Sequence, residues 1–328
     1  MNKKNPISLL VILIAVSLFM AACNGGAPAK PTAISVRLKW LHQVQFAGMY
    51  VAQHEGYYAD ENLEVTLDPV DFEQQISVDK VISGENDFGI GAPEEILMAR
   101  QEGKPVRALA VIYRINATIF LVTPESGIKT PQDFLGQKVA ISPGATEMIY
   151  IAMMDNLGLD RSQVEEVPVT TYDLWECWDS APVCPNYATN GPILLDTRGE
   201  DYTAIWPTDY GISWYGDVLF TSEQMIAEQP DVVAGFVRAT LHGWQKAIED
   251  TDLAVSATLD YDDQLDKEFQ TKAMRASIPL IDTGDAPLGV MDEAVWQSTQ
   301  QILINQGYLD KPMDLNAVYT NEFVESSK

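Results

Sequence analysis

Residues 34–67 read ISVRLKWLHQVQFAGMYVAQHEGYYADENLEVTL, and this stretch predicts the fold of the chain. Apolar and polar residues alternate from Ile34 to Leu41, which is the pattern of a strand with one buried face. Helical spacing follows from Phe46 to Tyr58, and a second alternating stretch runs from Leu63 to Leu67. Strand, helix and strand in this order form the unit from which parallel α/β sheets are built.

The alternation continues along the chain and predicts a largely parallel sheet with helices on both faces. Further strands are expected over Asp87–Gly91, Val106–Tyr113, Ile119–Thr123, Lys138–Ser142 and Val164–Val169, with helices over Phe72–Ser83, Pro93 to about Gly103, and Thr146–Leu157. The aromatic region from Tyr172 to Tyr215 has no clear periodicity and is expected to be irregular. From Ser222 to Gly307 the pattern is helical, with breaks at Pro230, Pro279 and Pro287.

The N-terminus predicts export. Lys3 and Lys4 precede an apolar run from Ser8 to Met20, which is shorter than the roughly 20 residues of a membrane span and is typical of a signal peptide. Met20-Ala21-Ala22-Cys23 resembles a bacterial lipobox. We therefore expect residues 1–22 to be a lipoprotein signal peptide, Cys23 to carry the lipid, and residues 23–33 to be a flexible tether. An ordinary signal peptide cut after Ala22 is the alternative.

The net charge of the chain limits the classes of partner that it is expected to bind. Residues 1–22 carry two lysines and no acid, so their removal from a chain of 328 residues and net charge −26 leaves 306 residues with net charge −28. This acidity argues against nucleic acid, anionic membrane surfaces and strongly anionic ligands. We expect a protein held on the extracytoplasmic face of the cell membrane by its lipid alone, since no later apolar stretch is long enough to cross a bilayer.

The remaining cysteines are Cys177 and Cys184. Export permits a disulfide between them, with a stabilisation on the order of 2 kcal/mol for so small a loop. A metal site is the alternative, but His42, His54 and His242 lie far away in sequence, so no metal is expected.

Four blocks, in order along nearly the whole mature chain, resemble the NMT1/THI5-like periplasmic binding proteins. The blocks are Arg37–Ala52 with Gly56–Tyr58, Ser83–Ile90, Ser126–Val139, and Asp209–Ile212 with Tyr215–Leu219. The resemblance implies an α/β, two-lobe periplasmic-binding-protein fold of type II, with ligand in the cleft. We expect no cofactor. It also implies an ABC permease and an ATPase as partners. We place the crossings between lobes near Thr123–Glu125 and Phe220–Ser222, so that residues 34–123 and 222–328 form one lobe and 124–221 the other.

In such sheets, ligands bind at strand ends and helix N-termini. In the first lobe, Trp40 and Phe46 are candidates for stacking on a flat ring, and Gln43 and Gln45 for hydrogen bonds to its polar edge. Glu94 could accept hydrogen bonds at the third strand, and Asn116 could reach the cleft. Core packing of Trp40, a solvated loop for the glutamines and favourable helix-dipole placement of Glu94 remain open as alternatives.

In the second lobe, the turn Ser142–Glu147 is the candidate contact. Gly144 allows close approach of the backbone, and the N–H groups of Ala145, Thr146 and Glu147 begin a helix that can bind an acceptor. Simple capping by Ser142 or Thr146 is the alternative.

Aromatic residues are dense from position 175 to 215 and suggest a lined pocket, among them Trp175, Trp178, Tyr187, Trp206, Tyr210, Trp214 and Tyr215. We favour Tyr187, Tyr210 and Trp214 as ligand contacts. Tyr187 and Asn190 are similar to the family's Tyr-x-x-Asn segment, but Gly191 stands where Glu is usual, so whether Asn190 meets ligand or only fixes the turn stays open.

The pyrimidine-binding members of the family resemble each other in an Asp-Trp-x-Pro-Asn-x-x-His-x-Gly segment, which matches residues 39–48. Only Trp40 and Gly48 are kept; Gln43 replaces the asparagine and Phe46 the histidine. Losing a polar partner for a buried ring costs about 1–3 kcal/mol, so the change favours a larger, more apolar ring. The family also has a riboflavin-importing branch, and we therefore expect riboflavin, with a thiamine pyrimidine precursor as the alternative.

Other classes of function are less well supported. Enzymes with this fold resemble one another in a cofactor lysine beside the third strand, and no lysine lies between Lys80 and Lys104. We expect a binding protein and not an enzyme. A sensor or adhesive lipoprotein of the same fold stays open, because sequence alone does not separate it from an importer subunit.

Overall fold

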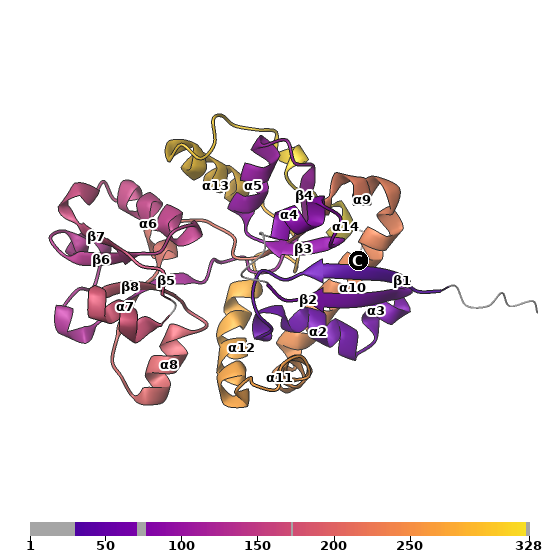
Figure 1. Ribbon diagram of the computed structural model, residues 1–328, viewed down its shortest axis with the longest axis horizontal. Coiled ribbons are helices and arrows are strands. Elements are labelled where there is room, and N and C mark those ends of the chain that lie inside the picture. The colour runs from indigo at the N-terminus through magenta and orange to yellow at the C-terminus, as the bar shows by residue number, and fades with distance from the viewer. Residues whose placement is uncertain (1–29, 71–76, 172, 326–328) are drawn as a thin grey trace, which may run out of the picture.

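The computed structural model describes residues 30–70, 77–171 and 173–325. Residues 1–22, Cys23 and most of the predicted tether lie outside this part of the chain. The described residues form two lobes, each built on a sheet of five strands with helices packed around it (Figure 1). The α/β, two-lobe fold predicted from sequence is therefore confirmed.

The first sheet has the strand order β2-β1-β3-β10-β4. Strands β1, β2 and β3 are parallel, whereas β10 is antiparallel to both of its neighbours, β3 and β4. The bounds are β1 Thr32–Arg37, β2 Leu63–Asp68, β3 Phe88–Gly91, β4 Val106–Val111 and β10 Val218–Ser222. The sheet is mixed and not fully parallel, because β10 arrives from the other lobe.

The second sheet repeats this plan, with the order β7-β6-β8-β5-β9. Strands β6, β7 and β8 are parallel, and β5 is antiparallel to β8 and β9. The bounds are β5 Thr118–Val122, β6 Lys138–Ile141, β7 Glu165–Pro168, β8 Val183–Tyr187 and β9 Thr203–Ile205. In each sheet the antiparallel strand is thus the first strand after a crossing between lobes.

This sheet membership differs from both expected crossing points. Strand β5 lies in the second sheet, so the chain crosses between Val111 and Thr118, ahead of Thr123–Glu125. Strand β10 lies in the first sheet, so the return crossing lies between Ile205 and Val218, ahead of Phe220–Ser222. The strands are buried along nearly their whole length and carry no alternation, so their sequence does not reveal which sheet they join.

Helices surround both sheets. In the first lobe they are η2 Val44–Phe46, α2 Ala47–His54, α3 Tyr57–Asp60, α4 Ser77–Ile82, α5 Pro93–Gln101, α9 Glu223–Glu228, α10 Pro230–Glu249, α11 Thr251–Leu259, α12 Lys267–Ile281, α13 Glu293–Asn305, η7 Leu315–Ala317 and α14 Glu322–Glu325. In the second lobe they are η3 Pro124–Ser126, η4 Pro131–Phe134, α6 Ala145–Asn156, η5 Arg161–Gln163, α7 Leu174–Ser180, α8 Gly191–Arg198 and η6 Pro207–Tyr210. Among the described residues, no helix combines the length and apolar character that a bilayer crossing requires.

The prediction of an irregular region from Tyr172 to Tyr215 is wrong, because α7, β8, α8 and β9 all lie within it. These elements are short, and β8 contains Pro185, which masks its strand pattern. The break expected at Pro279 is also wrong: this proline lies inside α12, two residues before the helix ends.

The predicted disulfide is formed, since Cys177 of α7 and Cys184 of β8 are bonded Sγ to Sγ at 1.96 Å. Both residues are buried in a core beneath the second sheet. The bond therefore fastens α7 to the strand that ends at Tyr187.

Helices α2 and α10 of the first lobe cross in close contact at two glycines. A Cβ on Gly48 would overlap the indole of Trp244, and a Cβ on Gly243 would overlap the Gly48 carbonyl. Gly48 is thus required by packing.

Gly243→Ala should lower the free energy of unfolding by about 1–3 kcal/mol, because the added methyl group forces α2 and α10 apart. Gly235→Ala on the same helix is the matched control. Its Cβ would meet only the side chain of Glu61, at 3.1 Å, so it should be neutral or stabilising by up to about 1 kcal/mol. Urea unfolding followed by tryptophan fluorescence measures both changes, and equal stabilities would contradict the assigned helix crossing.

Candidate functional site

The site lies at the end of the first sheet that faces the crossings between the lobes. We call this end, where several strands begin or stop, the edge of the sheet. Strands β1 and β3 end at this edge, and β10 begins there because it runs antiparallel. Lys39 follows β1, Glu94 opens α5 after β3, and Asp217 immediately precedes β10. Open α/β sheets bind ligands at such an edge.

Lys39 and Asp217 form an ion pair at this edge. The Lys39 Nζ donates to Asp217 Oδ1 at 3.0 Å and to the Gly216 carbonyl at 3.2 Å. The side chain of Asp217 is 6% exposed and that of Lys39 is 25% exposed. Burial lowers the pKa of the Lys39 ammonium, but the negative charge of Asp217, followed by Tyr187, Glu95 and Glu94, raises it well above its ordinary value. Lys39 therefore stays charged.

Gln43 and Gln45 extend this pair into a hydrogen-bonded chain. Gln45 Nε2 donates to Asp217 Oδ2 at 2.8 Å, and Gln43 Nε2 donates to Gln45 Oε1 at 2.8 Å. The two glutamines predicted to face ligand thus lie together beside Asp217. Both are half-buried, which excludes a fully solvated loop.

Glu94 is buried at the start of α5 and accepts a hydrogen bond from the Trp214 indole, Nε1 to Oε2, at 2.9 Å. Burial and the neighbouring Glu95 raise the pKa of the Glu94 carboxyl to about 7, against the opposing charge of Lys39. Two predicted residues from distant parts of the chain therefore meet, but the 2% exposed Trp214 offers no open face to a ligand.

The second sheet presents a matching edge. Strand β8 ends at Tyr187, which pairs with Thr118 at the start of β5 and is 50% exposed. Tyr187 is one of the groups that raise the pKa of Lys39, so the two side chains interact electrostatically across the lobes. Asn190 is exposed three residues later, and its side chain does not cap α8.

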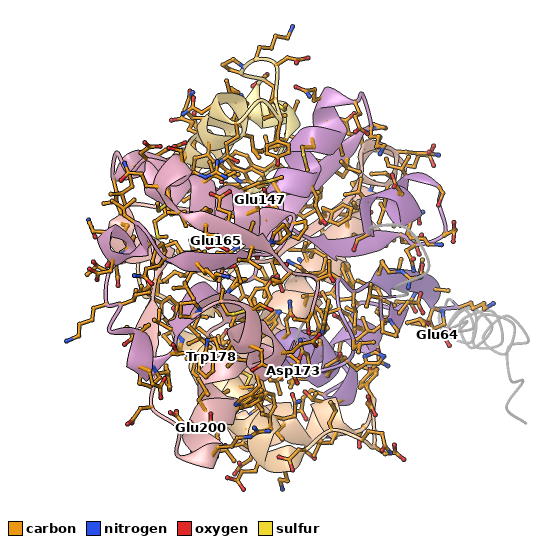
Figure 2. All side chains as sticks on the ribbon, turned by 60° about the vertical axis from the view of Figure 1, so that its left-hand side comes forward. Glu64, Glu147, Glu165, Asp173, Trp178 and Glu200 are labelled. Atoms are coloured by element: carbon orange, nitrogen blue, oxygen red, sulfur yellow. A yellow bond between two sulfur atoms is a disulfide. The ribbon has the colours of Figure 1, made fainter. Side chains whose placement is uncertain are left out.

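The turn after β6 lies at the same edge of the second sheet, since β6 and β8 are parallel. Gly144 has φ of 95°, and no side chain of Ser142 or Thr146 caps the helix that begins at Ala145. The first N–H groups of α6 are therefore not satisfied by capping, which leaves them able to bind an acceptor. Figure 2 shows Glu147, in the first turn of α6, in the upper part of the second lobe.

Several predicted residues have other roles. Phe46 is 2% exposed and packs in the core of the first lobe, so its ring offers no face to a ligand. The Asn116 amide bridges the crossings by donating to the Tyr215 carbonyl and accepting from the Thr118 N–H. The carbonyl of Tyr210 accepts from Asn156 at the far end of α6, about 16 Å along the helix from the Ser142 turn.

The late aromatic residues do not line one pocket. Trp175 and Trp178 pack on the core beneath the second sheet, and Trp178 lies in the lower part of that lobe, apart from Glu147 (Figure 2). Trp214 and Tyr215 are buried in another core. Their clustering in sequence reflects several short elements that each need an aromatic contact.

Trp40 follows Lys39 directly and is half-buried against the core of the first lobe. Its carbonyl accepts a hydrogen bond from Val70, which holds the loop after β1 in place.

Sequence reasoning missed Lys39 and Asp217. The signal for Lys39 was its position, because it stands where the pyrimidine-binding segment begins with an aspartate. Asp217 lay within a block that resembled the family, but nothing in its neighbourhood suggested a partner 178 residues away.

A cavity of about 250 Å³ lies elsewhere, between α13 and η7. It is lined by Glu293, Gln297, Gln300, Met313, Asp314, Leu315, Asn316 and Tyr319. All of these belong to the first lobe, so this cavity does not involve the meeting of the two sheet edges.

Glu94→Gln should change the pH dependence of stability. Between about pH 4.5 and 7 the unfolded chain loses a proton that folded Glu94 retains, so the wild type loses up to about 3 kcal/mol of stability as the pH rises. Glutamine keeps an acceptor for Trp214 without a charge and should abolish that loss. Urea unfolding at pH 5 and pH 8 measures it, with exposed Glu64→Gln as the control; an unchanged pH slope in Glu94→Gln would contradict the assignment.

Several known proteins are similar to this chain in sequence or in fold. A relative from Chloroflexus aurantiacus, named riboflavin-binding protein RibY, is 28% identical over 96% of this chain and 97% of its own. One from Halalkalibacterium halodurans, named formylaminopyrimidine-binding protein, is 26% identical over 93% and 95%. The solved structure of the periplasmic aliphatic sulphonate binding protein SsuA from Escherichia coli has a TM-score of 0.70 at 13% identity, over 88% of this chain and 91% of its own, and so shares the fold.

The family model described as NMT1/THI5 like matches residues 43–254. This range contains both crossings, the second sheet, and the β3 and β10 ends of the site. The chain therefore belongs to the NMT1/THI5-like family.

Proposed function

We propose that this protein is the solute-binding lipoprotein of an ABC importer and that it captures riboflavin or a closely related flat heteroaromatic vitamin. The observation that carries the proposal is the hydrogen-bonded chain of Gln43, Gln45, Asp217 and Lys39. Trp40 follows Lys39 directly in sequence, and Tyr187 of the other lobe interacts electrostatically with Lys39. An aromatic face next to fixed polar groups suits a flat ring with a polar edge. The family and the named relatives support a binding role and not catalysis.

Lobe closure would complete the site. Lys272 of α12 donates to Thr197 of α8 at 3.1 Å, and Gln306 after α13 donates to the Met148 carbonyl of α6 at 2.8 Å. Both contacts join the lobes, and they would separate when ligand enters or leaves. The released ligand would pass to a membrane permease driven by an ATPase.

A thiamine pyrimidine precursor is the second candidate, favoured by the formylaminopyrimidine-binding relative. An aminopyrimidine offers an exocyclic amine, which needs an acceptor. The carboxyl groups near Lys39 could supply that acceptor, so the polar groups at the sheet edge do not exclude the pyrimidine. Riboflavin is preferred because the riboflavin-binding relative is the more similar of the two, at 28% against 26% identity.

Titrating the protein into riboflavin should quench flavin fluorescence at micromolar protein or below, because the ring stacks on an indole. Trp40→Ala should weaken binding by about 10-fold through loss of stacking. Leu41→Ala, at the exposed neighbouring position, is the matched control and should bind like the wild type. Failure of the wild type to quench, or equal binding by Trp40→Ala, would count against the proposal.

The lipid anchor is a separate part of the proposal and rests on residues outside the described structure. Cys23→Ser should abolish labelling by radioactive palmitate and release the protein from the membrane fraction, because the thiol is the group that is alkylated. Retention of label in the variant would show that another residue carries the lipid.

A further inference from the structure

Lys39 is held in a fixed position and has one more N–H donor than its two hydrogen bonds use. An ammonium group has three N–H donors, and Lys39 uses one on Asp217 and one on the Gly216 carbonyl. A quarter of the side chain remains exposed at the sheet edge. The third donor is therefore available to a group that enters the cleft.

Asp217 fixes this donor without competing for the ligand. Its Oδ1 accepts from Lys39 and its Oδ2 accepts from Gln45, whose own Oε1 accepts from Gln43. Both carboxylate oxygens are thus occupied, and the side chain is nearly buried. Asp217 is a positioning residue that orients Lys39.

The charges near Lys39 determine which kind of ligand group can accept a hydrogen bond from it. Asp217 matches the charge of the ammonium directly at 3.0 Å, and negative charge from Glu95 and Glu94 further raises the pKa of Lys39. This balance repels an anion such as a sulfonate or phosphate. A neutral acceptor, above all a carbonyl oxygen, fits a donor whose charge is already matched.

We propose that Lys39 donates a hydrogen bond to a ring carbonyl, and that the dioxopyrimidine edge of the flavin lies at the edge of the first sheet. This deepens the proposed function and rests on it. The half-buried carboxyl group of Glu95 supplies an acceptor for the ring N–H that stands between the two carbonyls. The opposite, methyl-bearing edge of the flavin then points away from Lys39.

Flavin analogues test this orientation on the unaltered protein. Methylation at ring N3 places a methyl group between the two carbonyls and should weaken binding by about 10-fold or more. An 8-dimethylamino analogue changes the opposite edge and should bind within about 3-fold of riboflavin. Equal binding of riboflavin and its N3-methyl derivative, or the reverse order of the two analogues, would overturn the inference while leaving riboflavin capture intact. No binding of any flavin would instead overturn the proposed function.

A variant links the effect to Lys39. Lys39→Met alone would leave Asp217 buried without its partner and could unfold the protein, so the double variant Lys39→Met/Asp217→Asn is used, with a thermal melt to verify folding. It should bind riboflavin about 10-fold more weakly. Its discrimination between riboflavin and the N3-methyl derivative should fall to within about 3-fold. Discrimination as strong as in the wild type would show that Lys39 does not read that edge.

Discussion

The ion pair between Lys39 and Asp217 is the interaction on which the site depends. The pair joins the end of β1 to the start of β10, two strands of the same sheet. Lys39 and Asp217 are 178 residues apart in sequence. A buried pair of this kind is costly to desolvate and is tolerated only when further hydrogen bonds satisfy it, which Gly216 and Gln45 do here. Its value lies less in stability than in holding a donor at a fixed place on the sheet edge.

The topology of the two sheets explains why a donor at the position of Lys39 can contact a ligand held between the lobes. Each sheet receives, as its antiparallel strand, the strand that follows a crossing from the other lobe. The crossings themselves are hydrogen-bonded to each other, Asn116 N–H to the Trp214 carbonyl and Gly216 N–H to the Tyr113 carbonyl. They therefore form a short paired hinge that ends at Asp217. A ligand beside Lys39 would sit next to the hinge, where it can be contacted by both lobes.

Sequence predicted the class of fold because the strand and helix periodicities of residues 34–67 are strong and local. It misplaced the crossings because β5 and β10 are buried and uniform, and sheet membership depends on contacts far away in sequence. The same reason hid Asp217. Gln43 and Gln45 are expected in the loop after the first strand and lie there beside Asp217, whereas Phe46 and Trp214, chosen for their aromatic rings, are buried in cores.

The central claim is that a flat ring lies between the end of β1 and Tyr187 of the opposite lobe. A crystal structure of the protein grown with riboflavin tests this most directly. The account predicts flavin density stacked on Trp40, with a ring carbonyl within hydrogen-bond distance of Lys39 Nζ. Density confined to the cavity between α13 and η7, with the two sheet edges unoccupied, would contradict it.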